Sequence, residues 1–196
     1  MASYILNFPR FHHFLALLAA CVFPVHAALP IAPAPEIEAR AWLLIDTTSG
    51  RTLTEKNPDS KVEPASLTKL MTAYLAFSAI KENRLDLKQT LPVSEKAWRA
   101  EGSRMFLDPK KPAIVEDLLK GVIVQSGNDA CIVLAEAIAG TEEAFAAMMN
   151  STAKQLGMTQ THFVNSTGLP HAQHMTTARD LSRLASALIR DFPEFY

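Results

Sequence analysis

The segment EPASLTKLMT, residues 63–72, places a serine at the mouth of a helix and a lysine three residues later. Pro64 opens the segment, and the apolar residues after it recur at intervals of three and four, which predicts an amphipathic or buried helix that begins near Ser66. These apolar residues are Leu67, Leu70, Met71, Tyr74, Leu75 and Phe77. Two residues three apart on a helix share a face, so the Lys69 amine can approach the Ser66 hydroxyl.

This pairing has a chemical use. A free serine is a poor nucleophile and needs a neighbouring base. Lysine can be that base only when neutral, which requires a desolvated or positively charged setting that depresses its pKa. The helix N-terminus acts in that direction and also favours negative charge on an attacked carbonyl. Taken alone, the spacing is equally compatible with a helix cap followed by a solvated lysine.

A second candidate motif, Ser126-Gly127-Asn128, interrupts two apolar helical segments predicted at residues 115–124 and 128–139. Asn128 can cap the second of these helices, which stops at Gly140. A hydroxyl and an amide at such a corner can relay a proton and hold a substrate amide. The alternative is an ordinary turn followed by a helix cap.

The remaining pattern predicts an α+β plan in which helices dominate. A buried strand at 42–45, a turn at 47–50 and a second strand at 51–54 indicate a hairpin. Residues 83–112 are expected to be mostly loop. Further helices are predicted at 141–156 and at 177–190, the last with a capping box formed by Thr177 and Asp180.

Composition bounds the function. The chain has 196 residues, 48% of them hydrophobic and 20% charged, with a formal net charge of −1, which gives no electrostatic sign of a nucleic-acid partner. His171 and His174 lie three apart, but no cysteine or carboxylate cluster accompanies them, so we expect no metal site and surface or hydrogen-bonding roles for the histidines. Cys131 lies among apolar residues and is expected to be buried.

Residues 1–27 have the pattern of a secretory signal peptide. Arg10 precedes an apolar stretch from Phe14 to Phe23, and Val25 and Ala27 are small residues three before and one before a cut after Ala27. The alternative is lipid attachment at Cys21, because Leu18-Ala19-Ala20-Cys21 resembles a bacterial lipoprotein box. Either route predicts export, to the periplasm or the outer face of the cytoplasmic membrane.

The two motifs occur together with flanking sequence that extends the pattern. The segments are EPASLTKLMT (63–72), EGSRMF (101–106), QSGNDA (125–130), THF (161–163) and TARD (177–180). With these segments the chain resembles the low-molecular-mass penicillin-binding proteins, the D-alanyl-D-alanine carboxypeptidases of serine peptidase type, from about Trp42 to Tyr196. The resemblance implies a β-lactamase/DD-peptidase-like serine acyltransferase fold, a helical subdomain plus part of an antiparallel sheet.

The resemblance also implies roles for individual residues. Ser66 would attack the carbonyl between the terminal D-alanines of a peptidoglycan pentapeptide stem, and Lys69 would accept its proton. Ser126 would pass a proton to the departing D-alanine, and Asn128 would hold the substrate backbone. The Ser66 N–H would form half of an oxyanion hole. β-Lactam antibiotics would acylate Ser66 as covalent inhibitors, and no cofactor or metal is implied.

The family's third motif, Lys-Thr-Gly, is not among these residues. Residues 28–196 are therefore expected to be the N-terminal portion of the catalytic domain, with the third motif and any membrane-binding segment farther along. Two other functions stay open at this point. One is a class A β-lactamase, which would usually carry Ser-Asp-Asn at 126–128 and a glutamate that activates water. The other is a non-catalytic chain that keeps the fold.

Overall fold

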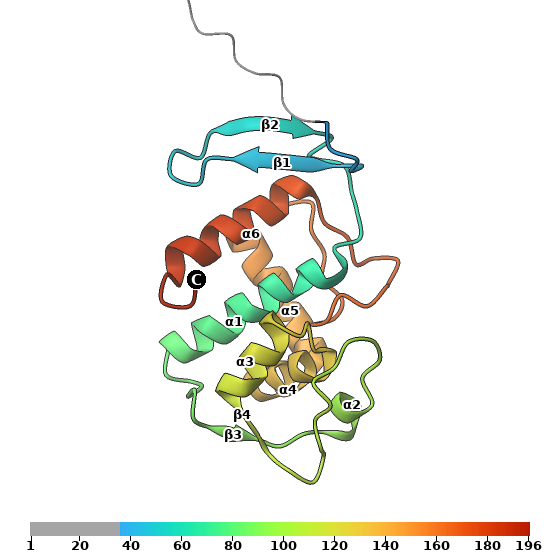
Figure 1. Cartoon of the computed structure of the whole chain (residues 1–196), viewed down its shortest axis with the longest axis vertical. Coiled ribbons are helices and arrows are strands. Elements are labelled where there is room, and N and C mark those ends of the chain that lie inside the picture. Colours follow the sequence, from blue (N-terminus) through green and yellow to red (C-terminus); the bar gives the residue numbers. More distant parts are fainter. Residues whose placement is uncertain (1–35) are drawn as a thin grey trace, which may run out of the picture. The chain divides into compact units, whose positions relative to one another are not determined.

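The computed structural model of the protein describes residues 36–196, and this part begins with a β-hairpin (Figure 1). Strand β1 (Trp42–Ile45) pairs antiparallel with β2 (Thr52–Lys56), with Trp42 opposite Lys56 and a register shift between Leu44 and Ile45. The Asp46 carboxylate accepts the N–H groups of Thr48 and Ser49, which closes the turn. The predicted hairpin is confirmed.

The burial predicted for β1 is wrong. Leu44 is 53% exposed, and no residue of β1 is fully buried. The reason is that β1 and β2 form a two-stranded sheet among the described residues, and the helix α6 (Ala178–Asp191) packs beside β1 (Figure 1). Side chains alternate between the faces of a strand, so those that point away from α6 remain exposed.

The helix predicted near Ser66 is confirmed, with a tighter beginning than expected. A 3₁₀ turn, η1 (Ala65–Thr68), leads directly into α1 (Lys69–Lys81). A 3₁₀ segment is a frequent way to begin an α-helix. Most of α1 is buried, because it lies between α6 on one side and α3 (Val115–Ile123) on the other (Figure 1).

The middle of the chain, residues 83–112, is mostly loop with short regular pieces, as expected. Strand β3 (Thr90–Leu91) pairs antiparallel with β4 (Ala113–Ile114), and the short helix α2 (Glu95–Trp98) follows β3. After β4 come α3, α4 (Asn128–Ala139) and α5 (Glu142–Gln155). All of these helices except α2 are where the apolar pattern predicts them.

One of the two predicted helix caps is confirmed, because Thr177 accepts the N–H of Asp180 at the start of α6. Thr141, for which no cap is predicted, accepts the N–H of Ala144 at the start of α5. The predicted cap by Asn128 is wrong: Gly127 is the N-cap residue of α4, and no side chain caps it. The Asn128 amide instead donates to Glu101, because the loop that contains Glu101 covers this end of α4.

The core has two parts that meet at α1 and α4. One lies among α1, α3 and α4, and the other among α1, α5 and α6.

Cys131 on α4 is fully buried, as its apolar surroundings predict, and burial raises the pKa of its thiol to about 12. In the described range 36–196, no helix has the length and apolar character needed to cross a membrane.

Candidate active site

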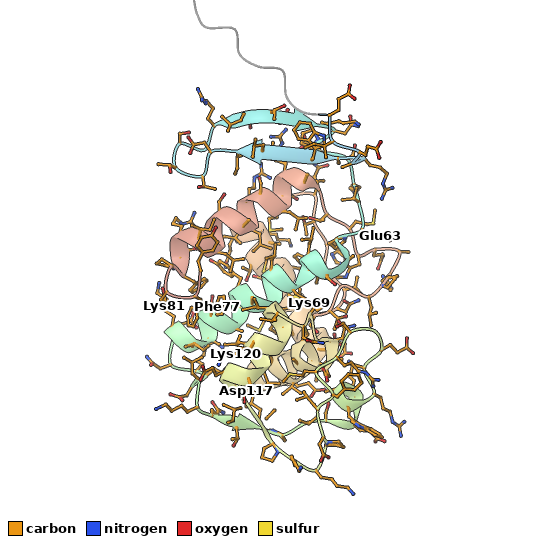
Figure 2. The ribbon with its side chains drawn as sticks, in the orientation of Figure 1. Glu63, Lys69, Phe77, Lys81, Asp117 and Lys120 are labelled. Carbon is orange, nitrogen blue, oxygen red and sulfur yellow. The ribbon has the colours of Figure 1, made fainter. Side chains whose placement is uncertain are left out.

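Three side chains from two distant parts of the sequence meet where η1 and α1 join. The Ser126 hydroxyl donates to Ser66 Oγ over 3.2 Å, and Lys69 Nζ lies 3.5 Å from the same oxygen. Ser66 is exposed, whereas Lys69 is 6% exposed near the beginning of α1 (Figure 2). The helical spacing of Ser66 and Lys69 thus gives the expected approach, and packing of α1 against α3 and α4 adds Ser126.

The backbone beside both serines has a left-handed conformation. Ala65, directly before Ser66, has φ +47°, and Ser126 has φ +56°. Such angles cost residues other than glycine about 1–3 kcal/mol each and persist only where the surroundings enforce them. They turn the two hydroxyl groups toward one another across the junction of η1 and the loop before α4.

The environment of Lys69 favours its neutral form. Burial lowers the pKa of Lys69 below its ordinary value of 10.5, because a charged ammonium loses its hydration there. The amine donates a 2.7 Å hydrogen bond to the Thr167 carbonyl. With one N–H held in this way, a neutral amine can direct its lone pair at the Ser66 hydroxyl. This is the direction of pKa shift that a lysine base requires.

The segment Asn165–Gly168 holds the Thr167 carbonyl in place. The Asn165 side-chain oxygen accepts from the N–H groups of Thr167 and Gly168 and from the Thr167 hydroxyl, which makes a tight turn. Thr72 on α1 donates to the Ser166 carbonyl over 2.6 Å. This segment is a part of the site that the sequence did not predict. The available signal was the turn-forming string Asn-Ser-Thr-Gly, but nothing local says that the turn reaches Lys69.

Glu142 also holds the segment Asn165–Gly168 in place. Its carboxylate accepts both the N–H and the hydroxyl of Ser166, at 3.0 and 2.7 Å, and forms an ion pair with Lys96. Glu142 is 8% exposed, so it is a buried structural acceptor as well as an acidic residue in the first turn of α5. Loss of this carboxylate would leave the buried N–H and hydroxyl of Ser166 without their acceptor.

Gly168 packs so closely on η1 that no side chain fits. A Cβ atom there would lie 1.9 Å from the Ala65 carbonyl oxygen, and the residue has φ +87°. We expect Gly168→Ala to displace Ala65 or the loop and to cost about 1–3 kcal/mol by overpacking. Thermal unfolding followed by circular dichroism measures this loss, at about 2–4 °C per kcal/mol for a chain of this size.

Gly140→Ala is the matched control for Gly168→Ala. Gly140 has a similar φ of +83°, but a Cβ atom there would meet nothing within 4 Å. This substitution therefore carries the backbone strain without the clash. If the two variants lose the same stability, the close contact with Ala65 is not what requires glycine at 168.

Asn128 lies under the loop of residues 101–107. Its amide nitrogen donates to the Glu101 carbonyl over 2.6 Å, and its backbone N–H donates to Ser103. The neighbouring Asp129 carboxylate fixes this loop by accepting the N–H groups of Met105 and Leu107. The Asn128 side-chain oxygen is buried and has no hydrogen-bond partner within the described residues. Among the described residues, no hydrogen bond joins the Asn128 side chain to Ser66, Lys69 or Ser126, and Asn128 is not among the residues that line the groove beside them.

A groove of about 570 Å³ opens beside the three polar side chains. It is lined by Ser66, Lys69 and Ser126 together with apolar residues in and around η1, α1 and α3, which are Pro64, Ala65, Leu67, Leu70, Ala73, Val122 and Ile123. Residues 36–196 contain no group of three or more histidine, cysteine or acidic residues placed to hold a metal ion. The arrangement is suited to attack by a serine on an acyl group bound along the groove.

Comparison with known proteins gives one consistent family. Residues 29–196 match the sequence profile described as D-alanyl-D-alanine carboxypeptidase. The Escherichia coli D-alanyl-D-alanine carboxypeptidase DacC is 46% identical over 189 residues, which cover 93% of this chain and 46% of that protein. The crystal structure of D-alanyl-D-alanine carboxypeptidase DacD from Francisella tularensis superposes with a TM-score of 0.83 at 45% identity, covering 86% of this chain and 41% of that one.

A second similar structure contains an antibiotic. Penicillin-binding protein D2 from Listeria monocytogenes, solved in its ampicillin-bound form, has a TM-score of 0.74 and 32% identity, and the match covers 83% of this chain and 66% of that one. The chain spans about half the length of the curated relatives it matches. The likeness in sequence and fold therefore extends over nearly all of this chain.

Proposed function

The chain belongs to the D-alanyl-D-alanine carboxypeptidase family, and from this premise we propose that it removes the terminal D-alanine from peptidoglycan stem peptides through an acyl-enzyme at Ser66. The observation that carries the proposal is the meeting at Ser66 Oγ of a buried lysine amine and a second serine hydroxyl. An exposed nucleophile, a base with a lowered pKa and a proton relay are what acyl transfer by a serine requires.

Acylation uses each of the three groups once. Lys69 Nζ takes the Ser66 hydroxyl proton as Oγ bonds to the carbonyl carbon between the two D-alanines. The carbon–nitrogen bond then breaks, and the proton reaches the departing D-alanine nitrogen through the Ser126 hydroxyl. The Ser66 N–H, at the start of the helix, stabilises the oxyanion. Asn128 contacts the substrate backbone. Water afterwards hydrolyses the ester and regenerates the Ser66 hydroxyl.

A β-lactam enters the same sequence of steps, because its strained ring contains an amide that Ser66 can open. The product stays covalently attached until water hydrolyses the ester. The ampicillin-bound relative supports this part of the proposal. The family match also favours a carboxypeptidase over the class A β-lactamase that the first motif alone would allow.

We also propose that the protein is exported, since its substrate lies in the cell wall. The signal-peptide pattern of residues 1–27 lies outside the described residues and remains a prediction from the sequence. One experiment tests export and acylation together: intact-mass spectrometry of the natural full-length protein, isolated from the cell envelope and treated with benzylpenicillin.

In that experiment we expect an N-terminus at Ala28 and a mass increase equal to one penicillin molecule. A lipid on Cys21 would replace the proposed cleavage with lipoprotein processing. Treated protein of unchanged mass would refute the acyl-enzyme. A separate assay of the same protein with a pentapeptide measures D-alanine release, and its absence would refute carboxypeptidase activity.

A further inference from the structure

His174 lies behind the turn that carries the nucleophile and contacts it directly. The ring is 2% exposed and packs edge-on against Phe163. Its Nε2 atom lies 2.8 Å from the hydroxyl of Thr68, which is itself fully buried. Thr68 stands between Ser66 and Lys69 in the sequence, so whatever fixes Thr68 also fixes the turn that presents both reacting groups.

The hydrogen bonds of His174 select one form of its ring. The Val164 N–H donates to Nδ1 over 3.1 Å. A backbone N–H can only donate, so Nδ1 must be unprotonated, and the proton of a neutral ring must be on Nε2. Nε2–H therefore donates to Thr68 Oγ1, and the ring joins a loop N–H to the nucleophile turn through two directed bonds.

His174 closes a loop whose other end, residues 166–168, contacts the same turn. Thr167 accepts a hydrogen bond from Lys69, Ser166 accepts one from Thr72, and Gly168 packs on Ala65. The backbone N–H of His174 also donates to the carbonyl of His171, which shapes the return of the loop toward η1. Residues 164–174 thus form a strap across η1 and the start of α1, and His174 is its last attachment.

We propose that His174 is a positioning residue for acyl transfer, whose neutral ring fastens this strap to Thr68 and so fixes the distance between Ser66 and Lys69. The inference rests on the proposed function, because it assigns a role in the same reaction. His174 contacts none of the reacting atoms. Its effect passes through Thr68 to the turn, and through the strap to the Thr167 carbonyl that holds the Lys69 amine.

The surroundings of the ring keep it neutral. Burial lowers the pKa of His174 to about 4, and charge on the nearby His162 and His171 acts in the same direction. Glu63, from the segment before η1, lines a small cavity together with His171 and His174. Since a protonated Nδ1 would face the Val164 N–H, charging the ring would break one of its two bonds.

Kinetics of penicillin acylation with paired variants tests the role. His174→Asn can keep an acceptor near Val164 but cannot reach Thr68, whereas the Nε2 amide of His174→Gln can still donate to Thr68. We expect His174→Asn to slow the acylation rate constant about 10- to 100-fold with unchanged noncovalent affinity, because small displacements of reacting groups have effects of this size. His174→Gln should restore most of the rate. His162→Gln should behave as wild type, because His162 is an exposed histidine outside the strap.

Thr68→Val tests the same hydrogen bond from the Thr68 side. It keeps the proposal testable even if His174→Asn does not fold. It removes only the hydroxyl acceptor and should slow acylation as His174→Asn does, whereas Thr68→Ser should not. Wild-type rates in both His174→Asn and Thr68→Val would overturn the proposal. So would a loss in His174→Gln as large as that in His174→Asn.

Nitrogen NMR of the imidazole separates this inference from the proposed function. At neutral pH the wild-type ring should be neutral, with Nε2 protonated. A protonated Nδ1 would refute the positioning role even in a protein that acylates normally. A wild-type protein that shows the expected form of the ring but does not react with penicillin would instead refute the proposed function.

Discussion

Ser66→Ala should abolish covalent labelling by a fluorescent penicillin in the natural full-length protein. The substitution removes the oxygen atom that both Lys69 and Ser126 contact, and alanine cannot form an ester. Loss of the nucleophile from a comparable serine peptidase lowers the rate by about 10⁶. Because Ser66 is exposed, its replacement removes little buried contact, and we expect the thermal stability to stay close to that of wild type.

The measurement is a labelling time course resolved by gel electrophoresis, with Ser186→Ala as the control. Ser186 is a helix α6 serine that lines a groove under the hairpin, away from the site. It should label as wild type does. Labelling of Ser66→Ala at the wild-type rate would show that another hydroxyl is the nucleophile and would remove the basis of the proposed mechanism.

Lys69→Arg should lose acylation although it keeps a positive charge and approximate bulk. Arginine does not give up its proton under these conditions, so it cannot accept one from Ser66. Removing a general base costs about 10²–10⁴ in rate. In the wild-type protein the acylation rate should rise with pH and level off above the pKa of Lys69, because only the neutral amine is a base. Burial lowers this pKa below 10.5.

Lys120→Arg provides the matched control. Lys120 is a largely exposed lysine on α3 that pairs with Glu116, and arginine can keep that ion pair (Figure 2). The control should show the wild-type rate and the wild-type pH profile. Normal acylation by Lys69→Arg would mean that the residue acts as an electrostatic partner and that some other group takes the proton.

The local features of the site could be predicted because they depend on short-range geometry. Ser66 and Lys69 are three residues apart, and any helical turn puts such a pair on one face. The cap at Thr177 follows from the same local logic, as does the end of α4 at Gly140. The hairpin follows from an apolar run, a turn and a second short strand-forming run that follow one another in the sequence.

The wrong predictions, a cap by Asn128 and a buried strand at 42–45, concern features that depend on long-range contacts. Asn128 is a good cap by composition, but the loop at 101–107 reaches over α4 and takes its amide for Glu101. Leu44 reads as a core residue, yet it is 53% exposed because α6 packs on one face of a two-stranded sheet. In each case a neighbour distant in sequence determines the environment, and periodicity along the chain has no information about that neighbour.

The helices, the hairpin and the pairing of Ser66 with Lys69 are encoded locally, since a dozen adjacent residues suffice to set each of them. The packing of distant segments brings Ser126 to Ser66 across 60 positions, lets Thr167 orient the lysine amine, and makes His174 and Glu142 buried anchors of the strap. These contacts depend on how α1 packs against its neighbours and on burial, which lowers the pKa of Lys69. Desolvation is a property of the packed core, so it appears only when distant segments come together.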